Sequence, residues 1–386
     1  MKKTLIAFAA LSAIAGVAQA QSSVTLYGLV DAYIGQTSRQ VNSTIPASQS
    51  AKLKQNVVNG SGQNNSRWGM RGTEDLGGGM KALFVLEGGF QPDTGEMATI
   101  SNQGGGLFGR QAWVGLSSGF GTVGLGRQYP AYDDLRGATN MIYDSNFATT
   151  ATVWGTGLQD YQNRSSNAIK YTSPDFAGFS GAITYGFGEN KTNANATATP
   201  PTPARDAENV ASIHFKYANG PLLVGFAHQR EKQVIGGTYF GSRAPGGVTI
   251  AVGLPSAPAT VNATRKYNLV GASYDFGVAK ITAQYNQAKG ETSATASAKD
   301  KEFNVGVSVP FGAAALAAGY SRSKSDGSGV GNTGSNRGTG VSLLGTYALS
   351  KRTNLYTGFL VTKVESANAA TETKASTFGL GVKHLF

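Results

Sequence analysis

The chain has 386 residues, no cysteine, three scattered histidines and a formal net charge of +11. The lack of cysteine excludes disulfide frameworks, thiol nucleophiles and the usual structural zinc sites, and the histidines lack metal-ligand spacing, so we expect no cofactor and no metal. Charged residues make up 14% of the chain, well below the ~25% of ordinary soluble domains, and 53 glycines favour short strands and turns over helices.

The first twenty residues, MKKTLIAFAALSAIAGVAQA, have the pattern of a bacterial signal peptide. Two lysines precede an apolar run over 5–17, and small residues lead to a cleavage point after Ala20. The run is shorter than the ~20 residues that a membrane-spanning helix needs. The sequence predicts a signal peptide over 1–20 and a single exported domain over 21–386.

Several later segments alternate between apolar and polar side chains, as strands do when one face meets lipid and the other water. In SSVTLYGLVDAYIG, for example, Val24, Leu26 and Ile34 share one face, while Tyr27 and Asp31 share the other. The segments are 22–35, 266–276, 279–290, 301–312 and 353–365. No run after the signal peptide reaches the ~18 apolar residues of a membrane helix.

Two kinds of connection alternate along the chain, and together they predict sixteen strands. The short turns lie at 75–80, 118–121, 174–179, 218–221, 275–278, 310–313 and 349–353. The long polar segments lie at about 36–63, 91–107, 128–165, 189–207, 231–263, 288–300, 324–338 and 365–373. Short turns on one side and long loops on the other are typical of an all-β, antiparallel transmembrane barrel, and barrels of about this size enclose an aqueous channel.

The chain ends in TFGLGVKHLF, a strand-like run with an aromatic last residue. Phe378, Leu380, Val382 and Phe386 share one apolar face. A closed barrel leaves no unpaired strand edge in hydrocarbon. We therefore expect this strand to close the ring, with Phe386 at the lipid interface.

Five stretches closely resemble the trimeric general porins of Gram-negative bacteria, nearest to the betaproteobacterial branch. They are SSVTLYGLVDAYIG, NNSRWGMRGTEDLGGGMKALFVLEGGF, LFGRQAWVGLSSGFGTVGLGRQ, NAIKYTSPDFAGFS and the terminal GVKHLF. The resemblance implies an outer-membrane homotrimer of sixteen-stranded barrels with short periplasmic turns, long extracellular loops and a third loop, about 128–165, folded into each pore. It implies passive diffusion of ions and small hydrophilic solutes, and a terminal Phe386 read by the barrel-assembly machinery.

In that family a basic wall faces acidic residues of the third loop across the narrowest part of the pore. Position by position, the basic wall corresponds to Arg67, Arg110 and Arg164, and we add Arg71 because it shares the strand parity of Arg67. Arg67 and Arg71 alternate against Trp68 and Met70, and Arg110 alternates against Gln111 and Trp113, which favours the lumen because an arginine facing mid-membrane lipid costs about 2–4 kcal/mol. Arg127 has the parity of Val123 and Leu125, so we expect it to point outward.

The acidic side corresponds to Asp133, Asp134 and Asp144. This chain departs from the family at Asn140, where enterobacterial relatives carry another acid. Loss of that acid while the arginines remain should tilt the pore towards anions.

Other function classes fit the sequence less well. An outer-membrane hydrolase is suggested by the G-x-S-x-G match at 115–119, but this match precedes a turn rather than a helix. A soluble lectin-like β-sandwich would not need the apolar terminal strand. The basic residues are dispersed and form no nucleic-acid motif. We expect no enzyme and no nucleic-acid partner, and we expect lipopolysaccharide to meet loop residues such as Arg230, Lys232 and Arg243.

Overall fold

The computed structural model describes residues 23–43, 50–98, 106–156, 158, 160–188, 209–234, 263–291, 297–328, 335–366 and 371–386. The predicted signal peptide and Arg243 lie outside these residues. The strands and helices are β1 (Ser23–Ser43), β2 (Ala51–Gly60), β3 (Arg67–Gly77), β4 (Met80–Gly89), β5 (Gln111–Ser118), β6 (Gly121–Gln128), α2 (Ala131–Ala138), α3 (Thr150–Val153), β7 (Ser165–Thr172), β8 (Phe179–Gly186), β9 (Asn209–Asn219), β10 (Leu222–Val234), β11 (Ala263–Asp275), β12 (Lys280–Glu291), β13 (Ser297–Phe311), β14 (Ala314–Ser328), β15 (Ser335–Ala348), β16 (Thr353–Ser366) and β17 (Thr371–Leu385).

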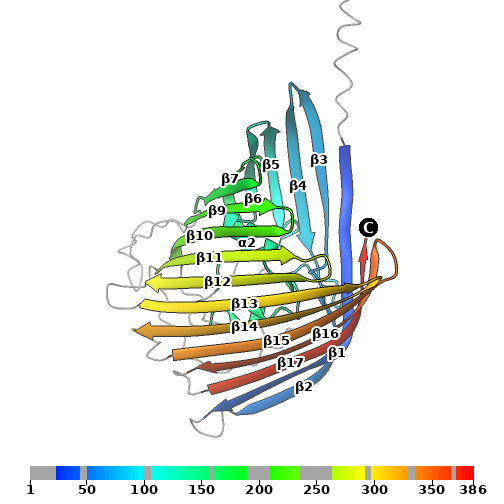
Figure 1. Cartoon of the computed structure of the whole chain (residues 1–386), viewed down its shortest axis with the longest axis vertical. Coiled ribbons are helices and arrows are strands. Elements are labelled where there is room, and N and C mark those ends of the chain that lie inside the picture. The colour runs from blue at the N-terminus through cyan, green and yellow to red at the C-terminus, as the bar shows by residue number, and fades with distance from the viewer. Residues whose placement is uncertain are drawn as a thin grey trace, which may run out of the picture.

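The strands form one closed antiparallel barrel (Figure 1). From β3 onward each strand pairs with the next along the chain, and β17 closes the ring by pairing with β1 from Leu29↔Leu385 to Ser43↔Thr371. Closure satisfies the backbone groups that an open sheet edge would expose to lipid. The predicted barrel is confirmed.

One position of the barrel holds two strands in succession. β2 pairs with residues 32–41 of β1, whereas β3 pairs with residues 23–29 of the same strand. In Figure 1, β2 and β3 accordingly lie at opposite ends of β1. In the described part of the chain, seventeen strands therefore occupy sixteen positions, which agrees with the predicted number, and residues 61–66 interrupt the shared position.

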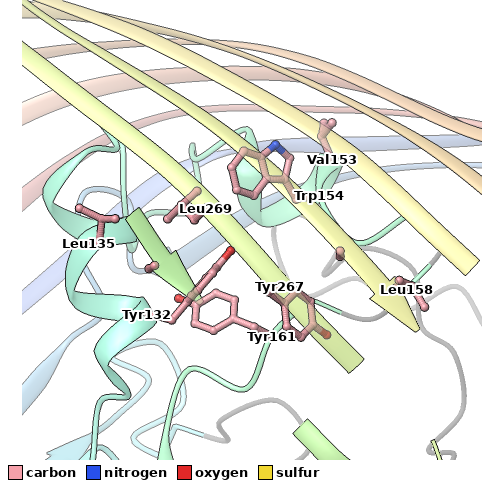
Figure 2. Close-up of a cluster of buried hydrophobic side chains, with 10 residues drawn as sticks. Tyr132, Leu135, Val153, Trp154, Leu158, Tyr161, Tyr267 and Leu269 are labelled. Atoms are coloured by element: carbon pink, nitrogen blue, oxygen red, sulfur yellow. The ribbon is translucent and has the colours of Figure 1, made fainter. Parts of the chain in front are cut away.

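The two faces of the sheet differ as the alternation predicts. On β1, Val24, Leu26 and Ile34 are 62–65% exposed on the outer face, whereas Asp31 and Tyr33 are buried inside. Leu29 has the inward parity and is also buried. The buried apolar clusters lie inside the ring, where helix α2 and its neighbours pack against the wall (Figure 2).

All seven predicted turns join consecutive strands, but the strands run further into the long connections than expected. β1 continues to Ser43 and β2 fills 51–60, so most of the predicted loop 36–63 is a hairpin. β12 to β15 likewise extend into 288–300 and 324–338. Both faces of these extensions meet water beyond the membrane, so polar residues occur on both faces. In the sequence, such a run resembles a loop.

The terminal residue completes the barrel seam. The Phe386 amide donates to the Gly28 carbonyl at 3.1 Å, and the Gly28 amide donates to the Phe386 carbonyl at 3.2 Å. Phe378, Leu380 and Val382 are 44–54% exposed on the outer face. The last strand thus presents its apolar side to the outside, as predicted.

Candidate functional site

Residues 129–156, 158 and 160–164 lie inside the barrel and contact its inner wall. The backbone N–H of Tyr132, in α2, donates to Ser212 Oγ of β9 at 2.8 Å, and the Tyr132 hydroxyl donates to Asn286 Oδ1 of β12 at 2.9 Å. Farther along, Thr149 Oγ1 lies 2.6 Å from Ser321 Oγ of β14. We call these residues the internal segment.

A buried arginine joins the two halves of the internal segment. The Arg136 guanidinium lies 4.7 Å from the ring centre of Trp154 and 4.6 Å from that of Tyr161, and it forms two 2.8 Å bonds to the Asp160 carboxylate. Figure 2 shows Trp154 and Tyr161 among the buried aromatic residues around Tyr132. Planar stacking and bidentate pairing are the interactions that favour arginine over lysine.

Wall carboxylates hold the backbone of the second half of this segment. The N–H groups of Gly155, Leu158 and Gln162 donate to Glu302, Asp300 and Glu231 respectively, at 2.5, 2.9 and 2.6 Å. None of these three acids is among the predicted site residues. Their signal is parity, since each alternates with outward lysines or arginines on β10 or β13.

Three of the predicted residues meet at one side of the lumen, around a glutamate that the sequence analysis did not single out. Arg110 Nε lies 2.7 Å from Glu87 Oε1, and Arg67 Nε lies 3.7 Å from Glu87 Oε2. Asp144 Oδ2, from the internal segment, lies 3.4 Å from Arg67 and 3.6 Å from Arg110. Glu87 could have been found as the one carboxylate of β4, on the inward parity of the strand and after the apolar run 82–86.

Tyr129 links Arg164 to this group. The Arg164 guanidinium carbon lies 3.6 Å from the Tyr129 ring centre, and both Arg164 and Arg110 donate to the Tyr129 hydroxyl at 2.7 Å. Arg110 and Arg164 are only 5% and 4% exposed, whereas the Arg67 side chain is 25% exposed. Arg71 is exposed and lies 5.1 Å over the ring of Tyr27, so Arg67 and Arg71 are the arginines that meet water.

Arg110 lies inside the barrel, but not because of strand alternation, so the predicted reason for its position is wrong. Val114 and Leu116 share its parity and are 58% and 60% exposed on the outer face. Arg110 precedes β5 at a bend, where strand alternation does not apply, and its N–H donates to the Glu87 carbonyl at 3.1 Å.

The three predicted acids of the internal segment have different surroundings. Asp133 accepts hydrogen bonds from the Tyr143 and Tyr161 hydroxyls, and burial raises the pKa of its carboxyl, although Arg164 acts against this. Asp134 lies 2.6 Å from Lys170 Nζ, and burial raises its pKa while Lys170 lowers it. Of the three, only Asp144 pairs with the predicted arginines.

The interruption between β2 and β3 positions Asp144. Asn65 donates to the Asp144 carboxylate, and the Asn146 N–H donates to the Ser61 carbonyl at 2.8 Å. The Asp31 carboxylate organises this interruption by accepting the N–H groups of residues 62–64 at 2.8–3.0 Å. Asp144 itself has a φ of +58°, a conformation that aspartate and asparagine tolerate better than most residues.

The G-x-S-x-G match and Asn140 both have a defined place in the structure. The G-x-S-x-G match ends β5 and leads through a tight turn into β6, without the helix that a nucleophile elbow needs. Asn140 donates to Thr150 Oγ1 at 3.0 Å within the internal segment. Within the described residues, no group of three or more histidine, cysteine or acidic side chains could hold a metal ion.

Comparisons with known proteins agree on one family. A sequence model of the family described as Gram-negative porin matches residues 7–383. The chain is 33% identical to an outer membrane porin protein of Bordetella pertussis over 74% of its own length and 69% of that protein. It matches the structure of an anion-selective porin from Comamonas acidovorans at 27% identity, with a TM-score of 0.69 over 95% of this chain and 100% of that one. A trimer form of OmpT from Vibrio cholerae shares the fold, with 18% identity and a TM-score of 0.63 over 95% and 99% of the two chains.

Proposed function

Because this chain belongs to the family of Gram-negative porins, we propose that the cluster around Arg67 and Asp144 is the constriction of an anion-preferring outer-membrane channel. The protein is a porin of the outer membrane, a passive channel and not an enzyme. We assign the basic side of the constriction to Arg67, Arg71, Arg110 and Arg164 and the acidic side to Asp144, with Asp133 and Asp134 supporting the internal segment. Residues 21–386 form the exported domain in this proposal, after removal of 1–20.

The observation that carries the proposal is the imbalance of charge in the cluster around Glu87 and Asp144. Among the salt bridges of this cluster those two carboxylates are the acidic groups, and four arginines stand on its basic side. Opposed charges in a narrow, low-dielectric aperture focus the field across it. The sign of the lining groups then sets the ion preference. Small dipolar solutes reorient in such a field, whereas large apolar molecules lose hydration and are excluded.

Removal of the acidic side should strengthen the anion preference. In Asp144→Asn we expect a larger zero-current potential of chloride-selective sign under a KCl gradient, because asparagine tolerates the positive φ and keeps an oxygen for Asn65 while the negative charge is lost. The effect should shrink at high salt, since the Debye length falls to about 3 Å at 1 M.

The matched control is Glu96→Gln, which removes the same charge from an exposed position outside the cluster. It should leave the potential unchanged. A native channel that prefers cations, or an Asp144→Asn channel with native selectivity, would overturn this assignment.

We further propose that the protein works as a homotrimer, in contact with outer-membrane lipid and lipopolysaccharide, and that the barrel-assembly machinery reads Phe386. Deletion of Phe386 removes two backbone hydrogen bonds to Gly28 as well as the aromatic ring. We expect the amount of heat-modifiable trimer in outer membranes to fall severalfold. A Phe386→Tyr control keeps both bonds and the ring and should assemble normally; normal assembly of the deletion would remove this role from Phe386.

A further inference from the structure

A band of basic side chains runs along the outer face of the barrel at its loop end. Each of eight consecutive strands, β10 to β17, contributes at least one lysine or arginine there, and all of these side chains are at least partly exposed. We call them the outer basic band: Arg230, Lys266, Lys289, Lys299, Lys301, Arg322, Lys324, Arg337, Lys363 and Lys374. In Figure 1 these strands lie side by side as one broad wall.

The register places members of the band directly opposite one another. Arg230 faces Lys266, Lys266 faces Lys289, and Lys289 faces Lys299, across four neighbouring strands. A second row joins Lys301, Lys324 and Arg337, and a third joins Lys363 to Lys374. Neighbouring strands lie about 4.8 Å apart, and like charges directly opposite destabilise a sheet. Such rows indicate that an anion from outside the chain neutralises them.

The acids of the chain neutralise only part of the band. Lys289, Lys324, Lys363 and Lys374 pair with neighbouring carboxylates at 2.6–3.3 Å. Six members form no salt bridge with the described part of the chain: Arg230, Lys266, Lys299, Lys301, Arg322 and Arg337. These six are available to bind an anion.

The surface directly below the band is apolar. Along β13, the outward side chains after Lys299 and Lys301 begin with Phe303, which is 42% exposed. Val270, Tyr285 and Val341 on neighbouring strands are 45–50% exposed. A lipid that carries anionic groups at the head of its acyl chains fits both the outer basic band and the apolar surface below it. Free phosphate fits only the band.

The band lies on one side of the barrel and at one of its two ends. Within the described residues of β7, β8 and β9, the lysines, Lys170 and Lys216, have the inward parity, so these strands add nothing to the band. All members lie at the end that carries the long connections, opposite the tight turns. That end faces the outer leaflet in a porin.

We propose that the outer basic band binds the phosphate groups of lipopolysaccharide, in place of the divalent cations that otherwise bridge neighbouring phosphorylated glycolipids. This inference rests on the outer-membrane placement in the proposed function, and it locates the lipid contact on strand faces: Arg230, expected on a loop, lies on β10. It does not depend on the ion preference of the pore.

The test uses the purified full-length protein in detergent and the triple variant Arg230→Gln, Lys266→Gln, Lys299→Gln. These residues lie in one row and form no salt bridge with the described part of the chain, and glutamine keeps a polar side chain without the charge. With phosphorylated lipopolysaccharide in EDTA, we expect affinity to fall between about tenfold and a hundredfold, because each basic residue near an anionic surface contributes on the order of a factor of five. Binding by the native protein should weaken as salt rises.

The control variant is Lys280→Gln, Lys351→Gln, Arg352→Gln, which removes three exposed charges at the opposite rim. It should bind lipopolysaccharide as the native protein does. Native-like binding by the band variant, equal binding of dephosphorylated lipopolysaccharide, or competition by inorganic phosphate at equal phosphate concentration would each overturn the proposal. Single-channel conductance of both variants reports separately on the pore, so failure of the constriction and failure of the lipid site are distinguishable.

Discussion

Replacement of Arg67 and Arg71 by glutamate is expected to convert a chloride-preferring channel into a cation-preferring one. These two arginines are the predicted wall residues most exposed to water, whereas Arg110 and Arg164 are buried among their partners. The double substitution reverses two charges beside Glu87 and Asp144, so the water-exposed lining becomes acidic. The sign of the lining sets the preferred ion.

The measurement is the zero-current potential of purified protein in a planar bilayer under a KCl gradient. Lys266→Glu with Lys301→Glu makes the same change of charge on the outer face and should leave the potential at its native value. A native potential of chloride-selective sign that survives Arg67→Glu with Arg71→Glu would show that these arginines do not set selectivity. Channel conductance at high salt checks that both variants form open barrels.

Removal of Arg136 should release the internal segment from the lumen. In Arg136→Met the bidentate bonds to Asp160 and both ring contacts are lost, while the apolar stem still fills space between Trp154 and Tyr161. Loss of one partner of a buried ion pair costs roughly 3–5 kcal/mol. Because the Asp160 side chain is 33% exposed, we expect a loss near the lower end of that range.

The expected readout is a larger and noisier single-channel conductance, with a lower temperature of barrel unfolding. Asp160→Asn is the second variant for comparison. Because it keeps an acceptor for Arg136, it should give a smaller change of the same kind. A native conductance in Arg136→Met would mean that the contacts to Glu231, Asp300 and Glu302 hold the segment without the arginine.

Much of the fold follows from periodicity, because lipid outside and water inside impose a two-residue repeat that sequence records directly. Most tight turns can be recognised equally well, since glycine occupies their positive-φ positions, as at Gly78 and Gly277; Ala177, with a φ of +54°, is the exception. The hairpin of β1 and β2 cannot be predicted from the sequence in this way. Beyond the membrane both of its faces meet water, and the alternation that marks a strand disappears.

The candidate site is less predictable, because it depends on contacts between residues far apart in the chain. The position of Arg67 follows from strand parity. Arg110 lies at a bend, where strand parity does not predict that the side chain enters the lumen. Glu87, Tyr129 and Asp31 carry no motif of their own. Their roles follow only once the internal segment is seen to cross the barrel and meet them.

The internal segment also has a consequence for the order of folding. Its partners belong largely to later parts of the chain: Tyr132 bonds to Asn286, Leu158 to Asp300, and Gly358 leaves space for the ring of Phe147. These docking sites do not exist until the second half of the chain has been inserted. Non-local contacts form late because chain closure must precede them. Docking of the internal segment can therefore be completed only after β16 has joined the barrel, long after the segment itself has been synthesised.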